Sequence, residues 1–170
     1  MFAGGTFTGR RKTVGERNSL FAYVGYKNKS DAGVGFLFSS RVQIEDIKLV
    51  SARLARADIV LGRLKMSIFM CYAPQNTDSH SEAYKDAIYV DLRKEMRAIK
   101  APYKPVIMGD FNGSISEEAH GSEWQCLGEA VDDQVSETSG NGHRLLVMAI
   151  DYCPFSRVFS AFPSKGNGCH

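Results

Sequence analysis

A short apolar run that ends in a glycine, a carboxylate and a carboxamide is the part of this chain best suited to chemistry. The run is Val106–Met108, and it is followed by Gly109, Asp110, Phe111 and Asn112. Three consecutive apolar residues predict a strand covered on both faces, and Gly109 predicts a turn of the backbone where a side chain would collide. Because Asp110 and Asn112 are two positions apart, we expect their side chains to point to the same side of the emerging chain.

Asp110 and Asn112 together suit the hydrolysis of a phosphate ester. A carboxylate can orient a water molecule or accept its proton, and a neutral amide can donate to a phosphoryl oxygen without repelling it. The same residues also fit an ordinary polar turn, because Asp, Asn and Gly are the commonest turn residues. A calcium loop fits less well, since Ile115 and Gly121 stand where an EF-hand has glycine and glutamate.

A second strand that ends in a polar loop is predicted earlier in the chain. Apolar residues alternate with others from Leu64 to Tyr72, and the loop residues 73–76 then interrupt the pattern. Between the two strands, Ser79 and Glu82 form a capping box, and an apolar stripe at helical spacing follows. The stripe consists of Tyr84, Ile88, Leu92, Met96 and Ile99. A helix therefore connects the two strands that deliver the polar groups.

The remaining pattern predicts a layered protein of sheets and helices. Strands are expected over 20–26, 34–38, 47–54, 58–61 and 158–162, and a short helix is expected over 145–150. The chain has 170 residues, of which 44% are hydrophobic and 24% charged. This composition is typical of a globular protein, and the length corresponds to one domain or most of one.

Charge and cysteine usage narrow the classes of function. Lys and Arg outnumber Asp and Glu by 21 to 19, so the net charge of +2 does not by itself argue for a nucleic-acid partner. The four cysteines are irregularly spaced and include no Cys-x-x-Cys pair, which predicts neither a zinc site nor a disulfide framework. The N-terminus has no apolar signal region, and no segment approaches the length of a membrane span. We expect an intracellular location, with the nucleus as one candidate, no secretion and no membrane association.

Residues 1–19 are expected to form a basic, flexible N-terminal arm. Its charge comes from Arg10, Arg11, Lys12 and Arg17. Such an arm could contact phosphates or act as a localisation signal, but the simpler interpretation is a solvated tail. The folded part of the protein is then residues 20–170.

Four landmarks, in this order along the chain, resemble the endonuclease/exonuclease/phosphatase superfamily. They are Gly33-Val34-Gly35-Phe36, Tyr72-Ala73-Pro74, Gly109-Asp110-Phe111-Asn112 and Asn141-Gly142 with the leucines that follow. Within the superfamily they look like the apurinic-endonuclease-type domains of LINE retrotransposons and of craniofacial-development-protein-like sequences. Phosphoinositide phosphatases and sphingomyelinases share the Gly-Asp-x-Asn motif but resemble the chain less. The similarity covers roughly residues 21–162, and an ordered set of motifs is more specific than any one of them.

This resemblance implies an α+β fold, an α/β sandwich. Two mainly antiparallel β-sheets would pack face to face with helices outside, in four layers. Family members also carry an Asn and a metal-binding Glu before the Gly-Val-Gly-Phe strand, and a Ser-Asp-His motif near the end, for which this chain has no counterpart. We therefore expect residues 20–170 to be a partial domain, incomplete at both ends.

The resemblance also implies metal-dependent hydrolysis of DNA phosphodiesters by an endonuclease of the retroelement type. Asp110 would orient or deprotonate the attacking water, and Asn112 and the hydroxyl of Tyr72 would hold the phosphate, so that these three are the expected catalytic residues. Gln75 and Asn76 would contact the substrate. Magnesium, with manganese as an alternative, would offset charge on the phosphate and the leaving oxygen.

The ligands of this metal are not assigned by the resemblance. Asp110 alone makes a weak magnesium site, and further ligands would have to come from Glu117 or Glu118. Because the Glu and the Ser-Asp-His motif have no counterpart, we expect this chain to hydrolyse DNA poorly or not at all. The alternative is a catalytically inactive remnant that acts as a binding module or is a degenerate open reading frame. No small-molecule cofactor is expected, and the sequence defines no oligomeric state.

Overall fold

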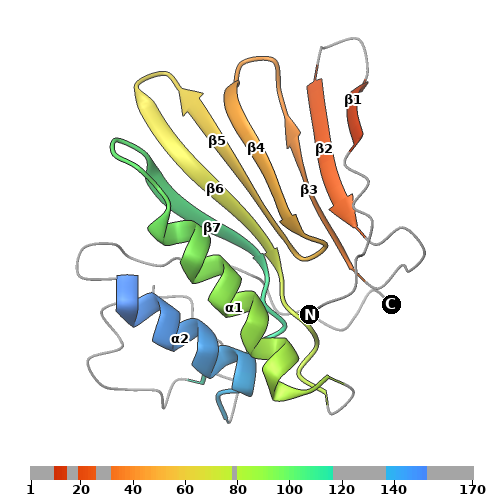
Figure 1. The fold of residues 1–170 in the computed structure, drawn as a ribbon, viewed down its shortest axis with the longest axis vertical. Coiled ribbons are helices and arrows are strands. Elements are labelled where there is room, and N and C mark those ends of the chain that lie inside the picture. Colours follow the sequence, from red (N-terminus) through yellow and green to blue (C-terminus); the bar gives the residue numbers. More distant parts are fainter. Residues whose placement is uncertain (1–9, 15–18, 26–31, 78–79, 117–136, 153–170) are drawn as a thin grey trace, which may run out of the picture. The chain divides into compact units, whose positions relative to one another are not determined.

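The computed structural model describes residues 10–14, 19–25, 32–77, 80–116 and 137–152 of the chain. These residues form seven strands and two helices, which makes the protein an α+β protein, as expected. They belong to two compact units, shown together in Figure 1. The first unit comprises Met1–Pro74 and Ala83–Phe111, and the second comprises Gln75–Glu82 and Asn112–His170.

The first unit contains two β-sheets. Sheet A has the order β1-β2-β3 and is antiparallel throughout. Its strands are β1 (Arg10–Val14), β2 (Ser19–Gly25) and β3 (Gly33–Phe38). Part of the expected flexible arm is therefore a strand, since β1 pairs with β2 along its whole length.

Sheet B has the order β4-β5-β6-β7. Its strands are β4 (Gln43–Ser51), β5 (Leu54–Leu61), β6 (Leu64–Tyr72) and β7 (Lys104–Asp110). The pairs β4–β5 and β5–β6 are antiparallel, whereas β7 runs parallel to β6. A parallel neighbour needs a crossover connection, and α1 (Glu82–Arg97) supplies it, as the helical stripe predicts.

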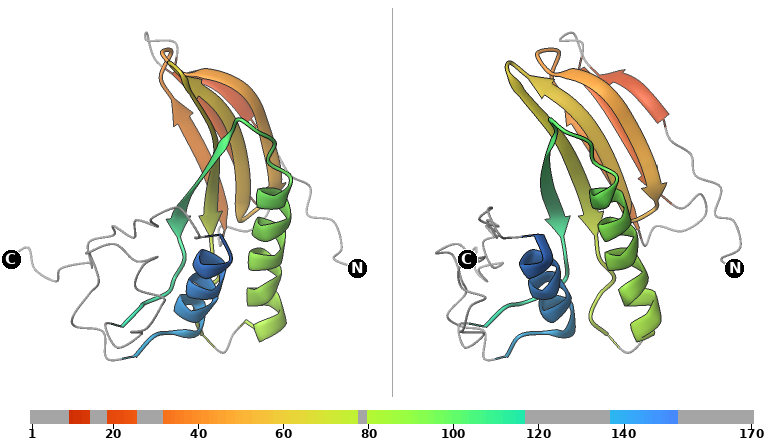
Figure 2. Two further views of the ribbon diagram at one scale, coloured as in Figure 1. Left: turned by 90° about the vertical axis from the view of Figure 1, so that its left-hand side faces the viewer. Right: turned by 60° about the vertical axis from the view of Figure 1, so that its left-hand side comes forward.

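Side-chain alternation explains why the two sheets pack face to face. The buried core joins residues of β2 and β3 to Ala55, Ala57 and Ile59 of β5. The intervening residues of β5, including Arg56 and Asp58, therefore point to the opposite face of sheet B. The helix α1 lies on that opposite face, where its Glu95 contacts Arg56, and Figure 2 shows α1 running alongside the strands of sheet B.

Three layers are thus present in the first unit: sheet A, sheet B and α1. The helix α1 turns Ile88, Leu92 and Met96 of the expected stripe inward, where all three are buried. A further helical layer outside sheet A, which a four-layered sandwich would have, stays a prediction. The capping residue Ser79 lies outside the described residues.

Two sequence-based expectations about the strands differ from the structure. The expected strand over 47–54 is interrupted, because β4 ends at Ser51 and β5 begins at Leu54 after a turn at Ala52 and Arg53. Neither residue is a common turn former, so the apolar pattern runs through the turn unnoticed. In addition, β7 is an edge strand among the described strands, and its Met108 is 44% exposed instead of covered on both faces.

The second unit is described mainly by α2 (Gly140–Tyr152), which is longer than the helix expected over 145–150. Ser139 is its N-cap, because the side-chain Oγ accepts a hydrogen bond of 3.1 Å from the backbone N–H of Gly142. This cap lets the helix begin at a glycine and enclose the Asn141-Gly142 motif in its first turn. The expected strand over 158–162 lies outside the described residues.

Gly109 in β7 must be a glycine for two reasons. Its φ of +145° is rarely adopted by other residues, and an added Cβ would lie 1.8 Å from the carbonyl oxygen of Cys71 in β6. The expectation that a side chain would collide at Gly109 is therefore confirmed, whereas the turn expected there is wrong, because Gly109 is paired within β7 and the strand ends one residue later.

We predict that Gly109→Ala lowers the free energy of unfolding by about 3 kcal/mol, because overlap with the backbone of β6 adds to the strained φ. The matched control is Gly62→Ala in the β5–β6 turn, where φ is +62° but no atom lies within 4 Å of the added Cβ. That change should cost only about 1 kcal/mol. Urea unfolding of both variants measures the difference, and equal losses would contradict the steric explanation.

Candidate active site

The neighbouring parallel strands β6 and β7 end at Tyr72 and Asp110, at the same end of sheet B. These two residues are register partners in the parallel β6–β7 pair, so their Cα atoms lie side by side. Register partners point to the same face of a sheet, and Tyr72 packs against the core between the two sheets. The side chain of Asp110 therefore projects from that same face. Asp110 is exposed and Tyr72 is half-buried, so both are placed at the rim of the sandwich.

Backbone hydrogen bonding continues beyond the last residue of β7. The N–H of Ala73 donates to the carbonyl oxygen of Asp110 over 2.9 Å. Together with the close approach of Gly109 to Cys71, this bond fixes the backbone that carries Asp110 against the end of β6. A carboxylate held at a rigid strand end, instead of in a loop, is well placed to orient a water molecule.

Arg53 supports Tyr72, and sequence reasoning missed it. Its guanidinium lies 5.0 Å from the centre of the Tyr72 ring and donates to the Tyr72 carbonyl oxygen over 3.4 Å. It also donates to the hydroxyl of Tyr84 at the start of α1 over 3.2 Å. Arg53 is only 5% exposed, and a buried arginine needs such partners. The available signal was an arginine within an apolar strand pattern, although the partner could not be read from the sequence.

Asn112 belongs to the second unit, and its position is set there. The side-chain Nδ2 of Asn141, which is fully buried, donates to the carbonyl oxygen of Asn112 over 3.2 Å. Asn112 has a φ of 46°, a left-handed conformation that asparagine tolerates better than most residues. Because β7 ends at Asp110, the alternation of an extended strand does not continue to Asn112, so the expectation based on that alternation does not apply.

The loop that follows Asn112 packs closely on the first turn of α2. A Cβ at Gly113 would lie 2.8 Å from the backbone nitrogen of Gly142, and a Cβ at Gly142 would lie 2.1 Å from the carbonyl oxygen of Ser114. The N–H of Ser139 donates to that same carbonyl oxygen over 3.0 Å. The Asn141-Gly142 motif therefore has a structural reason, since it anchors and accommodates the loop that carries Asn112.

The two expected substrate-binding residues, Gln75 and Asn76, are exposed and also belong to the second unit. The Asn76 side chain lies near the start of α2, because its Oδ1 would be 3.2 Å from a Cβ added at Gly140. The structure therefore brings Tyr72 and Asp110 together in one unit. Asn112 and Asn76 both lie near the first turn of α2 in the other.

The described residues contain no group of three or more His, Cys, Asp or Glu side chains that could hold a metal ion. Magnesium is commonly bound through one or two carboxylates while it keeps several waters. Asp110 supplies one exposed carboxylate, which by itself would be a weak magnesium site. Glu117 and Glu118, the other carboxylates considered, lie outside the described residues.

No protein-family model matches the chain, and a search of the curated proteins finds no similar sequence. The resemblance to the endonuclease/exonuclease/phosphatase superfamily thus rests on the four motifs and their order.

In the described part of the chain, no helix is long and apolar enough to cross a membrane.

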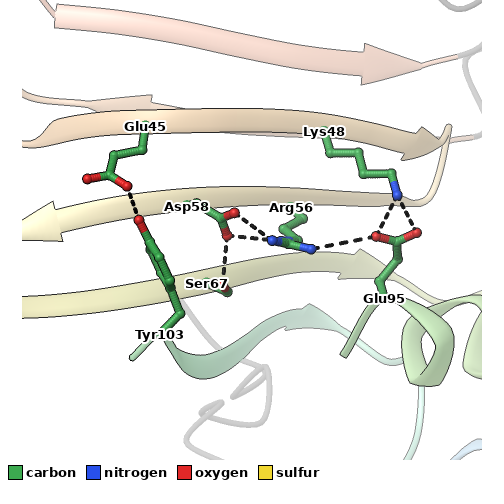
Figure 3. A network of polar contacts seen from close by, with 7 residues as sticks. All are labelled: Glu45, Lys48, Arg56, Asp58, Ser67, Glu95 and Tyr103. Carbon is green, nitrogen blue, oxygen red and sulfur yellow. Dashed lines mark hydrogen bonds and ion pairs between the residues drawn. The ribbon is translucent and has the colours of Figure 1, made fainter. Parts of the chain in front are cut away.

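A network of charged residues links α1 to sheet B on the face away from sheet A (Figure 3). The ammonium of Lys48 donates to both carboxylate oxygens of Glu95 in α1, at 2.7 and 2.9 Å. The guanidinium of Arg56 lies 3.9 Å from Glu95 and forms two hydrogen bonds with Asp58, at 2.9 and 2.5 Å. Ser67 in β6 donates to Asp58 over 2.7 Å. Because α1 leads directly into β7, this network helps to define where β7 meets the sheet.

The pKa of Asp58 is lower than its ordinary value of 3.8. Burial alone would raise this pKa, but the hydrogen bonds from Arg56 and Ser67 and the charge of Arg56 outweigh the effect of burial. The ionised carboxylate therefore stabilises the folded state above the unfolded-state pKa. This contribution is lost as the pH falls through the lower, folded-state pKa.

We predict that the free energy of unfolding decreases as the pH is lowered below about 4, and that Asp58→Asn makes this decrease smaller. Ser67→Ala should also make it smaller, because removal of one hydrogen bond brings the folded-state pKa closer to the unfolded value. Urea unfolding at several pH values measures the slope. Asp86→Asn, an exposed change on α1, is the control and should leave the slope unchanged. An equal slope in wild type and Asp58→Asn would contradict the assignment.

Proposed function

We propose that this protein is a metal-dependent phosphodiesterase that acts on DNA as an endonuclease. The observation that carries the proposal is the register pairing of Tyr72 with Asp110 at the ends of adjacent parallel strands. A hydroxyl donor and a carboxylate are thereby held at one edge of a rigid sheet, in a two-sheet sandwich of the class that the motifs imply. Paired functional groups at strand ends are typical of hydrolytic sites built on such scaffolds.

Each of the residues has a chemical role in the proposed reaction. Asp110 orients the attacking water and accepts its proton, which its exposure to solvent permits. The hydroxyl of Tyr72 and the side-chain amide of Asn112 donate hydrogen bonds to phosphate oxygens as negative charge develops there. Magnesium, or manganese, when bound, offsets charge on the phosphate and on the leaving oxygen.

Arg53 and Asn141 act indirectly in this proposal. Arg53 holds the ring and the carbonyl group of Tyr72, so that the phenol keeps one orientation. Asn141 holds the backbone of Asn112 through its carbonyl oxygen. Because the chain contains no Ser-Asp-His motif, we expect turnover to be slow compared with a complete enzyme of this type.

We predict that the purified chain nicks an end-labelled DNA duplex with a central abasic site slowly in magnesium, and that Asp110→Asn slows cleavage by at least about 100-fold. The amide keeps the size of the side chain but cannot accept the proton. Single-turnover cleavage on sequencing gels measures the rates, and relaxation of supercoiled plasmid provides a second substrate.

One control variant and two contrary outcomes define how this experiment is interpreted. Asp86→Asn removes one exposed carboxylate from α1 and should cleave at the wild-type rate. Cleavage by Asp110→Asn at the wild-type rate would exclude Asp110 from the site. Binding of the duplex without cleavage by the folded wild-type chain would reject the enzyme and favour a binding module.

We predict separately that Tyr72→Phe slows cleavage by about 100-fold while its urea unfolding stays close to wild type. The substitution removes only the hydroxyl and retains the ring on which Arg53 lies. Equal cleavage rates for Tyr72→Phe and wild type would show that the hydroxyl makes no contact in the transition state. A large loss of stability would instead give Tyr72 a structural role.

A further inference from the structure

A second surface of interest lies at the end of sheet B opposite Tyr72 and Asp110. Three chain segments meet there, which we call the distal edge: residues 39–45, 60–66 and 98–104. Strand pairing places them side by side, since Gln43 pairs with Val60, Leu61 with Leu64, and Met66 with Lys104. Figures 1 and 2 show the β5–β6 turn and the start of β7 at this same end of the sheet.

The fold concentrates positive charge at the distal edge. Five cations lie in its three segments: Arg41, Arg63, Lys65, Lys100 and Lys104. The same segments contain one carboxylate, Glu45, so their net charge is 5 − 1 = +4, whereas that of the whole chain is +2. The sequence hides this concentration because the segments are far apart along the chain.

Most of this charge is not neutralised by the residues that the structure describes. Glu45 is already engaged by Lys65, at 3.5 Å, and by the hydroxyl of Tyr103. The other four cations are exposed and form no ion pair with any residue that the structure describes. The Lys65 ammonium also lies 5.5 Å from the centre of the Tyr103 ring, which places an aromatic ring beside one of these cations.

We propose that the distal edge binds the phosphate backbone of double-stranded nucleic acid. Arg41 precedes β4, Arg63 lies in the β5–β6 turn, Lys65 lies in β6, Lys100 precedes β7 and Lys104 begins it, so the cations come from segments that together span about 14 Å at the usual strand spacing. Nucleic-acid backbones present regularly spaced negative charge, and Lys and Arg bind it by displacing condensed counterions. The exposed large apolar side chains at this edge are Leu61 and Leu64, beside one turn, so charge dominates the surface and favours a nucleic acid over a lipid bilayer.

This surface goes beyond the proposed function. The eight residue steps from Leu64 to Tyr72 along β6 span about 26 Å, so this surface does not form part of the candidate active site. It would supply sequence-independent affinity, which phosphate contacts provide without reading bases. Its test therefore does not depend on whether the chain cleaves DNA.

The experiment measures binding of a fluorescent 20-base-pair duplex without an abasic site, by anisotropy in EDTA over a series of salt concentrations. The test variant combines Arg41→Gln, Arg63→Gln, Lys100→Gln and Lys104→Gln, all at exposed positions. The matched control combines Arg41→Lys with Arg63→Lys and keeps the charge. Urea unfolding establishes that each variant is folded.

We expect the quadruple variant to bind at least about 10-fold more weakly than wild type at low salt, while the charge-preserving control stays within about 2-fold. The slope of log affinity against log salt should become shallower by up to about 3.6, or about 0.9 for each lost contact. Unchanged affinity and slope in the folded variant would overturn the proposal. Absence of duplex binding by wild type would do the same, as would binding to phosphatidylserine vesicles but not to the duplex.

Discussion

The contact between Gly109 and the backbone of Cys71 is the constraint on which the architecture of the candidate site depends. It allows β7 to approach β6 closely just before both strands end, at a place where no side chain would fit. The parallel pairing can then continue to Tyr72 and Asp110, and one further backbone bond joins Ala73 to Asp110. Because Gly109 has no side chain, the hydroxyl-bearing Tyr72 and the carboxylate-bearing Asp110 can lie side by side at the end of the sheet.

The charged network between α1 and sheet B helps to position the other end of β7, where the strand begins. Lys48 and Arg56 hold Glu95 of α1 against sheet B, while Asp58 and Ser67 complete the hydrogen bonding of Arg56. Breaking a buried ion pair is more costly than the pair is stabilising, because the remaining charge loses its partner. Moving α1 out of this position would therefore cost more free energy than the network contributes to stability. The position of α1 in turn helps to define where β7 starts.

Short-range patterns in the sequence predicted much of the fold. Alternation identified β6, helical spacing identified α1, and the glycine before Asp110 indicated the end of β7. The turn at Ala52 and Arg53 was missed because neither residue has a turn preference and the apolar pattern continues through it. The edge position of β7 was also missed, since three apolar residues in a row are compatible with a half-exposed strand.

For the candidate site, the sequence could identify polar residues at strand ends but not their supports. Arg53 reaches Tyr72 across a β-hairpin, and Asn141 in α2 reaches Asn112 in the loop after β7, so neither contact has a local signature. The concentration of cations at the distal edge also has no local signature, because strand pairing brings together residues that are distant along the chain. Long-range contacts of this kind depend on tertiary structure, which residue periodicity does not encode.

The burial of Cys71 beside Gly109 also makes this junction chemically observable. Burial raises the pKa of the thiol to about 12, with the nearby charge of Arg53 opposing the increase. At neutral pH only about one thiol in 10⁵ is then the reactive thiolate, so the folded chain should resist alkylation and oxidation at this position. Labelling of the buried Cys71 thiol would require this part of the fold to open locally. Its rate would therefore report how often that opening occurs while the rest of the protein stays folded.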